Sequence, residues 1–154
     1  MISVVMLSGA LLLTGTSNLC ARLGETEAEC AARYGKTSEG KPNKFGEKLQ
    51  LYQAGGMLIS ITFINGRAEC IAFEKQPPAD WPEEEIELLL RANAQGKEWH
   101  RIESWGDWPL RWSRSDKARA RYRGRRPFHD FLVIETDAYV ELQTKKDNPA
   151  LQNF

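Results

Sequence analysis

Residues 57–74 read Met-Leu-Ile-Ser-Ile-Thr-Phe-Ile-Asn-Gly-Arg-Ala-Glu-Cys-Ile-Ala-Phe-Glu, and this stretch decides the fold. Two β-rich runs flank Asn65-Gly66, a pair typical of a type I′ hairpin because both turn positions need φ > 0. The sequence therefore predicts an antiparallel hairpin of residues 57–64 and 67–74. Uninterrupted pairing would bring together one apolar core face, formed by Ile59, Ile61, Phe63, Ala68, Cys70 and Ala72.

A helix and a further strand are predicted before this hairpin. Residues 25–34 are good helix formers, and Gly35 is a common cap at the C-terminal end of a helix. A polar loop over residues 36–48 leads to a strand over 49–53, which reaches the hairpin through Gly55-Gly56. The first half of the chain is thus expected to be one helix followed by antiparallel strands.

The second half repeats this order after Gln76-Pro77-Pro78, which resembles a linker. Asp80-Trp81-Pro82-Glu83 fits the start of a helix capped by Asp80, and that helix is expected to end near Gly96. Strands are predicted over 99–102, 110–113, 118–123 and 131–136, with 138–143 extending the last of them. The fold class is therefore α+β, a single domain over 22–154 built of two tandem units, 22–76 and 77–144.

Residues 24–74 carry a family resemblance. Gly24-Glu-Thr-Glu-Ala-Glu-Cys-Ala-Ala-Arg-Tyr-Gly35, followed by a loop and Ile59-Ser-Ile-Thr-Phe63, resembles the small protein A family of bacterial outer-membrane assembly lipoproteins. The doubled helix-plus-sheet arrangement is similar to the β-lactamase-inhibitor-protein fold. The resemblance implies this topology and a non-catalytic surface protein, and it transfers no functional residue to this chain.

The N-terminal segment 1–21 carries no charged residue and holds a short apolar run, as a secretory signal peptide does. We expect a periplasmic or secreted protein. Cleavage after Ser17 and cleavage after Ala21 are both compatible with a signal peptide, because Ser17 and Ala21 are small residues. An uncleaved anchor is the alternative, although the run is shorter than the roughly 20 residues that cross a bilayer. Membrane association would need that anchor or a lipid on Cys20, which follows Leu19 rather than a small residue.

Charge is balanced overall but unevenly distributed. Lys plus Arg and Asp plus Glu both number 21, so a neutral chain disfavours a nucleic-acid partner. The basic residues gather over 101–126, where Arg119, Arg121 and Arg123 alternate and so share one face of a strand. With Trp105 and Trp108 nearby, this face is the candidate binding surface for a protein partner or an anionic polymer. The alternative is a solvated face whose arginine stems cover apolar surface.

Cys30 and Cys70 form the disulfide candidate. Export places them in an oxidising compartment, and their spacing is not that of a metal site. Cys30 lies on the predicted helix and Cys70 on the predicted core face of the hairpin, so the two thiols could meet. The alternative is two buried cysteines that act as small hydrophobic residues.

Catalytic chemistry finds little support in the sequence. The two histidines are His100 and His129, and no nucleophile-elbow, zinc-protease, Cys-x-x-Cys or phosphate-loop motif occurs. His129 and Asp130 are neighbours in a predicted strand and would point to opposite faces. The sequence predicts an exported, non-catalytic protein-interaction module without cofactor or metal. The alternatives are a binding module for an anionic glycan or other polyanion, and a small hydrolase with a dispersed site.

Overall fold

The computed structural model describes residues 21–42, 47–103, 109–124 and 130–148. Within these ranges the chain forms three helices and eight strands. In chain order they are α1 (Glu27–Tyr34), β1 (Ser38–Glu39), β2 (Lys48–Ala54), β3 (Met57–Ile64), β4 (Arg67–Lys75), α2 (Glu83–Ala92), β5 (Trp99–Arg101), β6 (Leu110–Arg114), β7 (Arg119–Arg123), β8 (Phe131–Glu135) and α3 (Asp137–Asp147).

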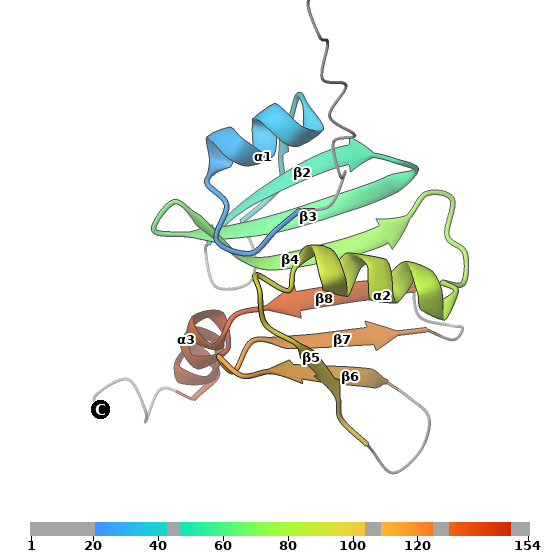
Figure 1. Cartoon of the computed structure of the whole chain (residues 1–154). Coiled ribbons are helices and arrows are strands. Elements are labelled where there is room, and N and C mark those ends of the chain that lie inside the picture. Colours follow the sequence, from blue (N-terminus) through green and yellow to red (C-terminus); the bar gives the residue numbers. More distant parts are fainter. Residues whose placement is uncertain (1–20, 43–46, 104–108, 125–129, 149–154) are drawn as a thin grey trace, which may run out of the picture.

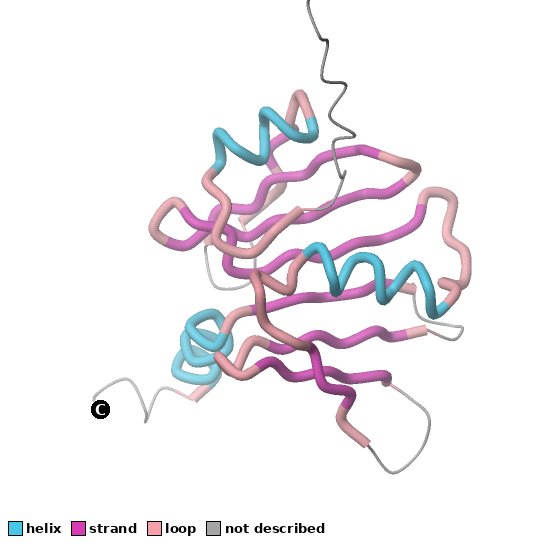
Figure 2. The backbone as a smooth tube through the Cα atoms, viewed as in Figure 1, coloured by secondary structure: helices cyan, strands magenta, loops and turns pink. Residues whose placement is uncertain are grey.

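The strands form one antiparallel sheet in the order β1-β2-β3-β4-β8-β7-β6-β5. The last strand, β8, pairs with β4 and joins the two halves of the sheet at its centre. Helices α1 and α2 lie on the same face of the sheet, and α3 lies at one end of it (Figure 1). The strands of both halves follow one another as a single layer (Figure 2). The predicted α+β class is confirmed.

The hairpin forms as predicted at its turn. Asn65 and Gly66 have φ values of 51° and 75°, the left-handed region that this turn requires. Phe63 pairs with Ala68, also as predicted. The register then shifts between Thr62 and Phe63, so that uninterrupted pairing fails beyond this point.

The shift is a β-bulge on β4, where Glu69 is the extra residue. Cys70 pairs with Thr62, and Ile71 pairs with Ile61. One extra residue turns every later side chain of the strand to the other face. The prediction that Cys70 and Ala72 belong to the core face is therefore wrong, and Ile71 and Phe73 take their place.

The core lies between the sheet and the two helices α1 and α2. The buried side chains that cover the sheet are Cys30 and Tyr34 of α1 and three apolar residues of α2. Tyr34 packs against Tyr52 of β2 with ring centroids 5.4 Å apart. The sheet residues beneath are fully buried, and they include Ile59, Ile61, Ile71, Phe73, Leu132 and Ile134.

Both ends of helix α1 are fixed by residues within or next to the helix in the sequence. The Thr26 hydroxyl accepts a hydrogen bond from the Glu29 backbone N–H at 3.3 Å, and the Glu29 carboxylate accepts one from the Thr26 N–H at 2.7 Å. This reciprocal capping box fixes the first turn. Gly35 ends the helix with φ 80°, as its position predicts.

Helices α2 and α3 depart from the sequence prediction. Helix α2 begins after Pro82 without a side-chain cap, so the predicted capping by Asp80 is wrong. Residues 138–143 are helical rather than a continuation of β8. The reason is Thr136, whose hydroxyl accepts a hydrogen bond from the Tyr139 N–H at 3.1 Å and so caps α3.

Candidate functional site

The face of the sheet opposite α1 and α2, called the open face below, carries the predicted arginines. Arg119, Arg121 and Arg123 are exposed on β7, while Ala120 and Tyr122 between them are buried on the core side. Arg111 of β6 pairs directly with Arg121 and adds a fourth guanidinium. The alternation of β7 therefore does place these side chains on one face.

A hollow of about 500 Å³ lies at this part of the open face. Its lining holds four arginines and one carboxylate, that of Glu135. Arg121 and Glu135 form an ion pair at 3.5 Å, with the Glu135 side chain 10% exposed. Arg111 and Arg119 form no ion pair with any of the described residues. The hollow is therefore cationic although the chain as a whole is neutral.

Of the other residues singled out in the sequence, His100 is described and does not line this hollow. Trp105 and Trp108 lie outside the described residues, as does His129. His100 is exposed on the edge strand β5, opposite Ser113. In the described ranges no group of three or more His, Cys, Asp or Glu side chains could hold a metal ion. Nor does the described part of the chain contain a helix long and apolar enough to span a membrane.

The two cysteines lie on opposite faces of the sheet. Cys30 belongs to α1 and is fully buried in the core, whereas the bulge turns Cys70 toward the open face. Both are free thiols, so the predicted disulfide does not form. Burial, and next the nearby Glu25 carboxylate, together raise the pKa of Cys30 to about 12. Burial likewise raises the pKa of Cys70 to about 12, together with Glu135.

We therefore expect both thiols to resist alkylation in the folded protein. A thiol is a nucleophile only as the thiolate, which these pKa values suppress at about pH 8. Peptide mapping after iodoacetamide treatment should find Cys30 and Cys70 unmodified in native buffer and fully modified in guanidinium chloride. Rapid native modification of Cys30, or a mass two protons lower in the peptides that hold both residues, would contradict this.

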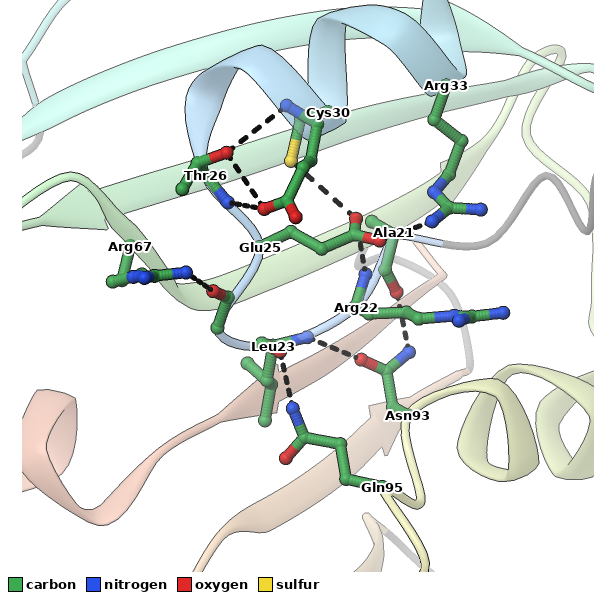
Figure 3. A network of polar contacts seen from close by, with 12 residues as sticks. Ala21, Arg22, Leu23, Glu25, Thr26, Cys30, Arg33, Arg67, Asn93 and Gln95 are labelled. Atoms are coloured by element: carbon green, nitrogen blue, oxygen red, sulfur yellow. Dashed lines mark hydrogen bonds and ion pairs between the residues drawn. The ribbon is translucent and has the colours of Figure 1, made fainter.

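The segment Ala21–Glu25, called the N-terminal strap below, is a feature that the sequence did not reveal. The Asn93 amide donates a hydrogen bond to the Ala21 carbonyl at 2.7 Å and accepts one from the Leu23 N–H at 3.0 Å (Figure 3). Gln95 donates to the Leu23 carbonyl at 2.6 Å. On the other side, the Gly24 N–H donates to the Ala68 carbonyl of β4 at 2.8 Å. The strap thus connects the loop after α2 with the central hairpin.

Arg114 holds that loop in place from β6. Its guanidinium donates to the carbonyls of Asn93 and Ala94 and, at 3.0 Å, to the Gln95 side chain. It also donates two hydrogen bonds of 2.8 Å to Asp116, and it lies 5.0 Å from the ring centre of Trp99. One buried arginine therefore organises the residues that hold the N-terminal strap.

No protein-family model, curated protein or solved structure matches this chain. The resemblance over residues 24–74 accordingly stays a prediction.

Asp116 should make stability depend on pH. The hydrogen bonds from Arg114, and next those from Lys97, hold the pKa of Asp116 well below its ordinary value. As the pH falls below about 4, the unfolded chain takes up this proton before the folded one, so the stabilisation is complete above that pH and lost below it. Urea unfolding should show the curves of the wild type and Asp116→Asn converging between about pH 4 and pH 2. Parallel curves would contradict this, and Glu87→Gln, an exposed change on α2, is the control.

A larger groove lies on the other face of the molecule. It has a volume of about 1020 Å³ and runs beside α2, with Met57, Trp81 and Leu88 among its lining residues. Leu88 is 54% exposed there, an unusual position for a large apolar side chain on this protein. This groove is a second candidate binding surface, which mutations can distinguish from the cationic hollow on the open face.

Proposed function

We propose that the protein is an exported, non-catalytic protein-interaction module of the cell envelope or secretome that binds its partner through the open face. The observation that carries the proposal is the cationic hollow, in which four arginines face one carboxylate. Guanidinium groups form bidentate hydrogen bonds with carboxylates, so the surface suits an acidic segment of another protein.

The strength of such binding depends on several contacts made together. A single exposed ion pair contributes only about 0–1 kcal/mol. The open face presents Arg111, Arg119, Arg121 and Arg123 on two adjacent strands, so one partner segment can reach more than one of them. Arg121 is already paired with Glu135, which holds its side chain in place for a second carboxylate.

The architecture supports a binding role of this kind. We propose that the two halves are tandem units, similar to the β-lactamase-inhibitor-protein arrangement. In each half a helix precedes four strands, α1 before β1–β4 and α2 before β5–β8. Pairing of β4 with β8 joins the open faces of the two halves, and α3 covers the part beside Cys70, where Tyr139 interacts with the thiol. The resemblance of residues 24–74 to the small protein A family agrees with an envelope location.

The test is capture of a partner from envelope extract, followed by affinity measurement with that partner purified. Arg119→Ala combined with Arg121→Ala should weaken binding at least about tenfold, since it removes two guanidinium groups from the hollow. Lys36→Ala with Lys145→Ala removes the same charge from exposed positions outside both the hollow and the groove, and should leave affinity unchanged. A stoichiometric partner that survives the first pair but is lost on Leu88→Glu would move the binding site to the groove beside α2.

Binding of an anionic polymer is the second candidate. Arg111 and Arg119 have no carboxylate partner among the described residues, so sulfates or carboxylates of a glycan could take that place. Heparin-like polymer that binds with a steep salt dependence, in the absence of a protein partner, would favour this function. No described feature supports the hydrolase alternative, because His100 lines neither the cationic hollow nor the groove beside α2.

A further inference from the structure

We propose that the groove beside α2 is a small-molecule site whose ligand is an amphiphile with one apolar chain and an anionic head group, a carboxylate or a phosphate. The groove shares no lining residue with the cationic hollow, so its occupancy does not depend on the protein partner proposed above. Its volume of about 1020 Å³ lies at the upper end of the range of small-molecule sites, roughly 300–1,000 Å³.

The first observation is the apolar wall of the groove. Trp81, Leu88 and Leu89 line it from the side of α2, together with Met57 of β3. Trp81 and Leu89 are buried, whereas Leu88 is one of only two large apolar side chains that are exposed in the described ranges. An alkyl chain that covers Leu88 removes apolar surface from water, which favours binding. The wall therefore suits the apolar part of the ligand.

The second observation is the charge of the lining. The charged residues of the groove are Arg22, Lys75, Arg91 and Glu85. Lys75 already pairs with Glu85 at 2.7 Å, and its ammonium group lies 5.5 Å from the ring centre of Trp81. Neither Arg22 nor Arg91 forms an ion pair with any of the described residues. Two guanidinium groups thus remain for a ligand, and guanidinium groups bind carboxylates and phosphates through paired hydrogen bonds.

The third observation is a donor without an acceptor. The Arg22 Nε is buried, yet it has no hydrogen-bond partner among the described residues. In Figure 3 the Arg22 side chain extends away from the N-terminal strap, and no dashed line reaches its guanidinium. Buried donors are almost always paired with protein, water or a ligand. The oxygen of an anionic head group in the groove provides the acceptor.

The positions of these groups give the ligand a direction. Arg91 lies in the last turn of α2, and Arg22 belongs to the strap, which Gln95 holds at the same end of the helix. Trp81 precedes the first turn of α2, at the opposite end. The head group therefore lies near the C-terminal end of α2, and the chain runs along the helix past Leu88 toward Trp81.

Isothermal titration of the full chain tests the ligand class, with dodecanoate, dodecyl phosphate and dodecyltrimethylammonium each kept below its micelle concentration. One molecule of an anion should bind per chain, and the cation should bind at least about tenfold more weakly. Decanoate, which is two methylenes shorter than dodecanoate, should bind about tenfold more weakly than dodecanoate. The tighter of the two dodecyl anions identifies the head group as a carboxylate or a phosphate. Equal binding of anions and cation, or no saturable binding, would overturn the proposal.

Variants locate the site. Arg22→Gln combined with Arg91→Gln should weaken dodecanoate binding at least about tenfold. Leu88→Glu should do the same, because it places a carboxylate in the apolar wall. Lys36→Gln combined with Lys145→Gln removes the same charge outside both the hollow and the groove, and should leave the affinity unchanged. Wild-type affinity in both groove variants would overturn the proposal.

Measurements on the wild type cover the case in which a groove variant does not fold. The Trp81 Nε1 is also buried without a partner among the described residues, so its indole N–H resonance, assigned with Trp81→Phe, should shift when dodecanoate is added. The midpoint of thermal unfolding should rise, because the ligand binds the folded chain. An unmoved Trp81 resonance or a falling midpoint would overturn the proposal. Binding that is lost only in Arg119→Ala with Arg121→Ala would place the ligand on the open face, which overturns this site and leaves the proposed function standing.

Discussion

Replacing Phe73 with alanine is expected to lower the free energy of unfolding by about 3–5 kcal/mol. Phe73 is 0% exposed and pairs with Ile59 on one side and Leu132 on the other, at the centre of the sheet. Loss of the ring removes buried apolar surface and leaves a cavity that the surrounding strands cannot fill. Urea unfolding should show a lower midpoint with an unchanged slope.

The neighbouring residue provides the control for this change. Ala72 lies on the open face opposite Ser60, and Ala72→Ser should cost about 1 kcal/mol or less. Uninterrupted pairing of the hairpin would reverse the two results, because Ala72 would then be in the core and Phe73 outside it. A mild Phe73→Ala and a severe Ala72→Ser would therefore refute the bulge at Glu69.

Replacing Arg114 with alanine is expected to cost a similar amount, about 3–5 kcal/mol. Arg114 is 5% exposed, and its guanidinium is shared among Asp116, the Gln95 side chain and the carbonyls of Asn93 and Ala94. Removing it leaves the carbonyl of the fully buried Asn93 without its donor and takes away the buried side chain that packs against Trp99. Thermal and urea unfolding measure the loss of stability.

Two further variants separate the causes of that loss. Arg114→Lys keeps the charge but loses the planar fork, so it should fall between the wild type and Arg114→Ala. Arg111→Ala changes an exposed arginine of the same strand and should alter stability by only about 0.5 kcal/mol. If Arg114→Ala were as mild as Arg111→Ala, the buried arginine would not organise the loop as described. Arg114→Ala should also expose the Arg22–Leu23 bond to trypsin.

The parts of the fold that local chemistry encodes were predictable from the sequence. Asn65-Gly66 specifies its turn because few other residue pairs adopt positive φ at both positions. Gly35 ends α1 for the same kind of reason. The alternation of β7 placed Arg119, Arg121 and Arg123 on one face without knowledge of any neighbour. Each of these features depends on residues adjacent in the chain.

The features that the sequence did not reveal depend on distant contacts. The bulge at Glu69 is stabilised by Thr136, whose N–H donates to the Glu69 carbonyl at 2.9 Å. The same threonine begins α3, where apolar and β-forming residues had indicated a strand. Asn93 is only the residue after α2 in the sequence, and its role becomes visible once Ala21 and Leu23 lie against it. Tertiary structure, rather than propensity, decides at these places.

The position of β8 has a consequence for how the chain folds. This strand is the last of the sheet to be synthesised, yet it pairs with β4 at the centre. Joining Cys70 with Glu135 requires closure of a long loop, which is slow because chain entropy is lost before the contact is gained. The two halves of the sheet therefore remain unjoined until residue 135 is available.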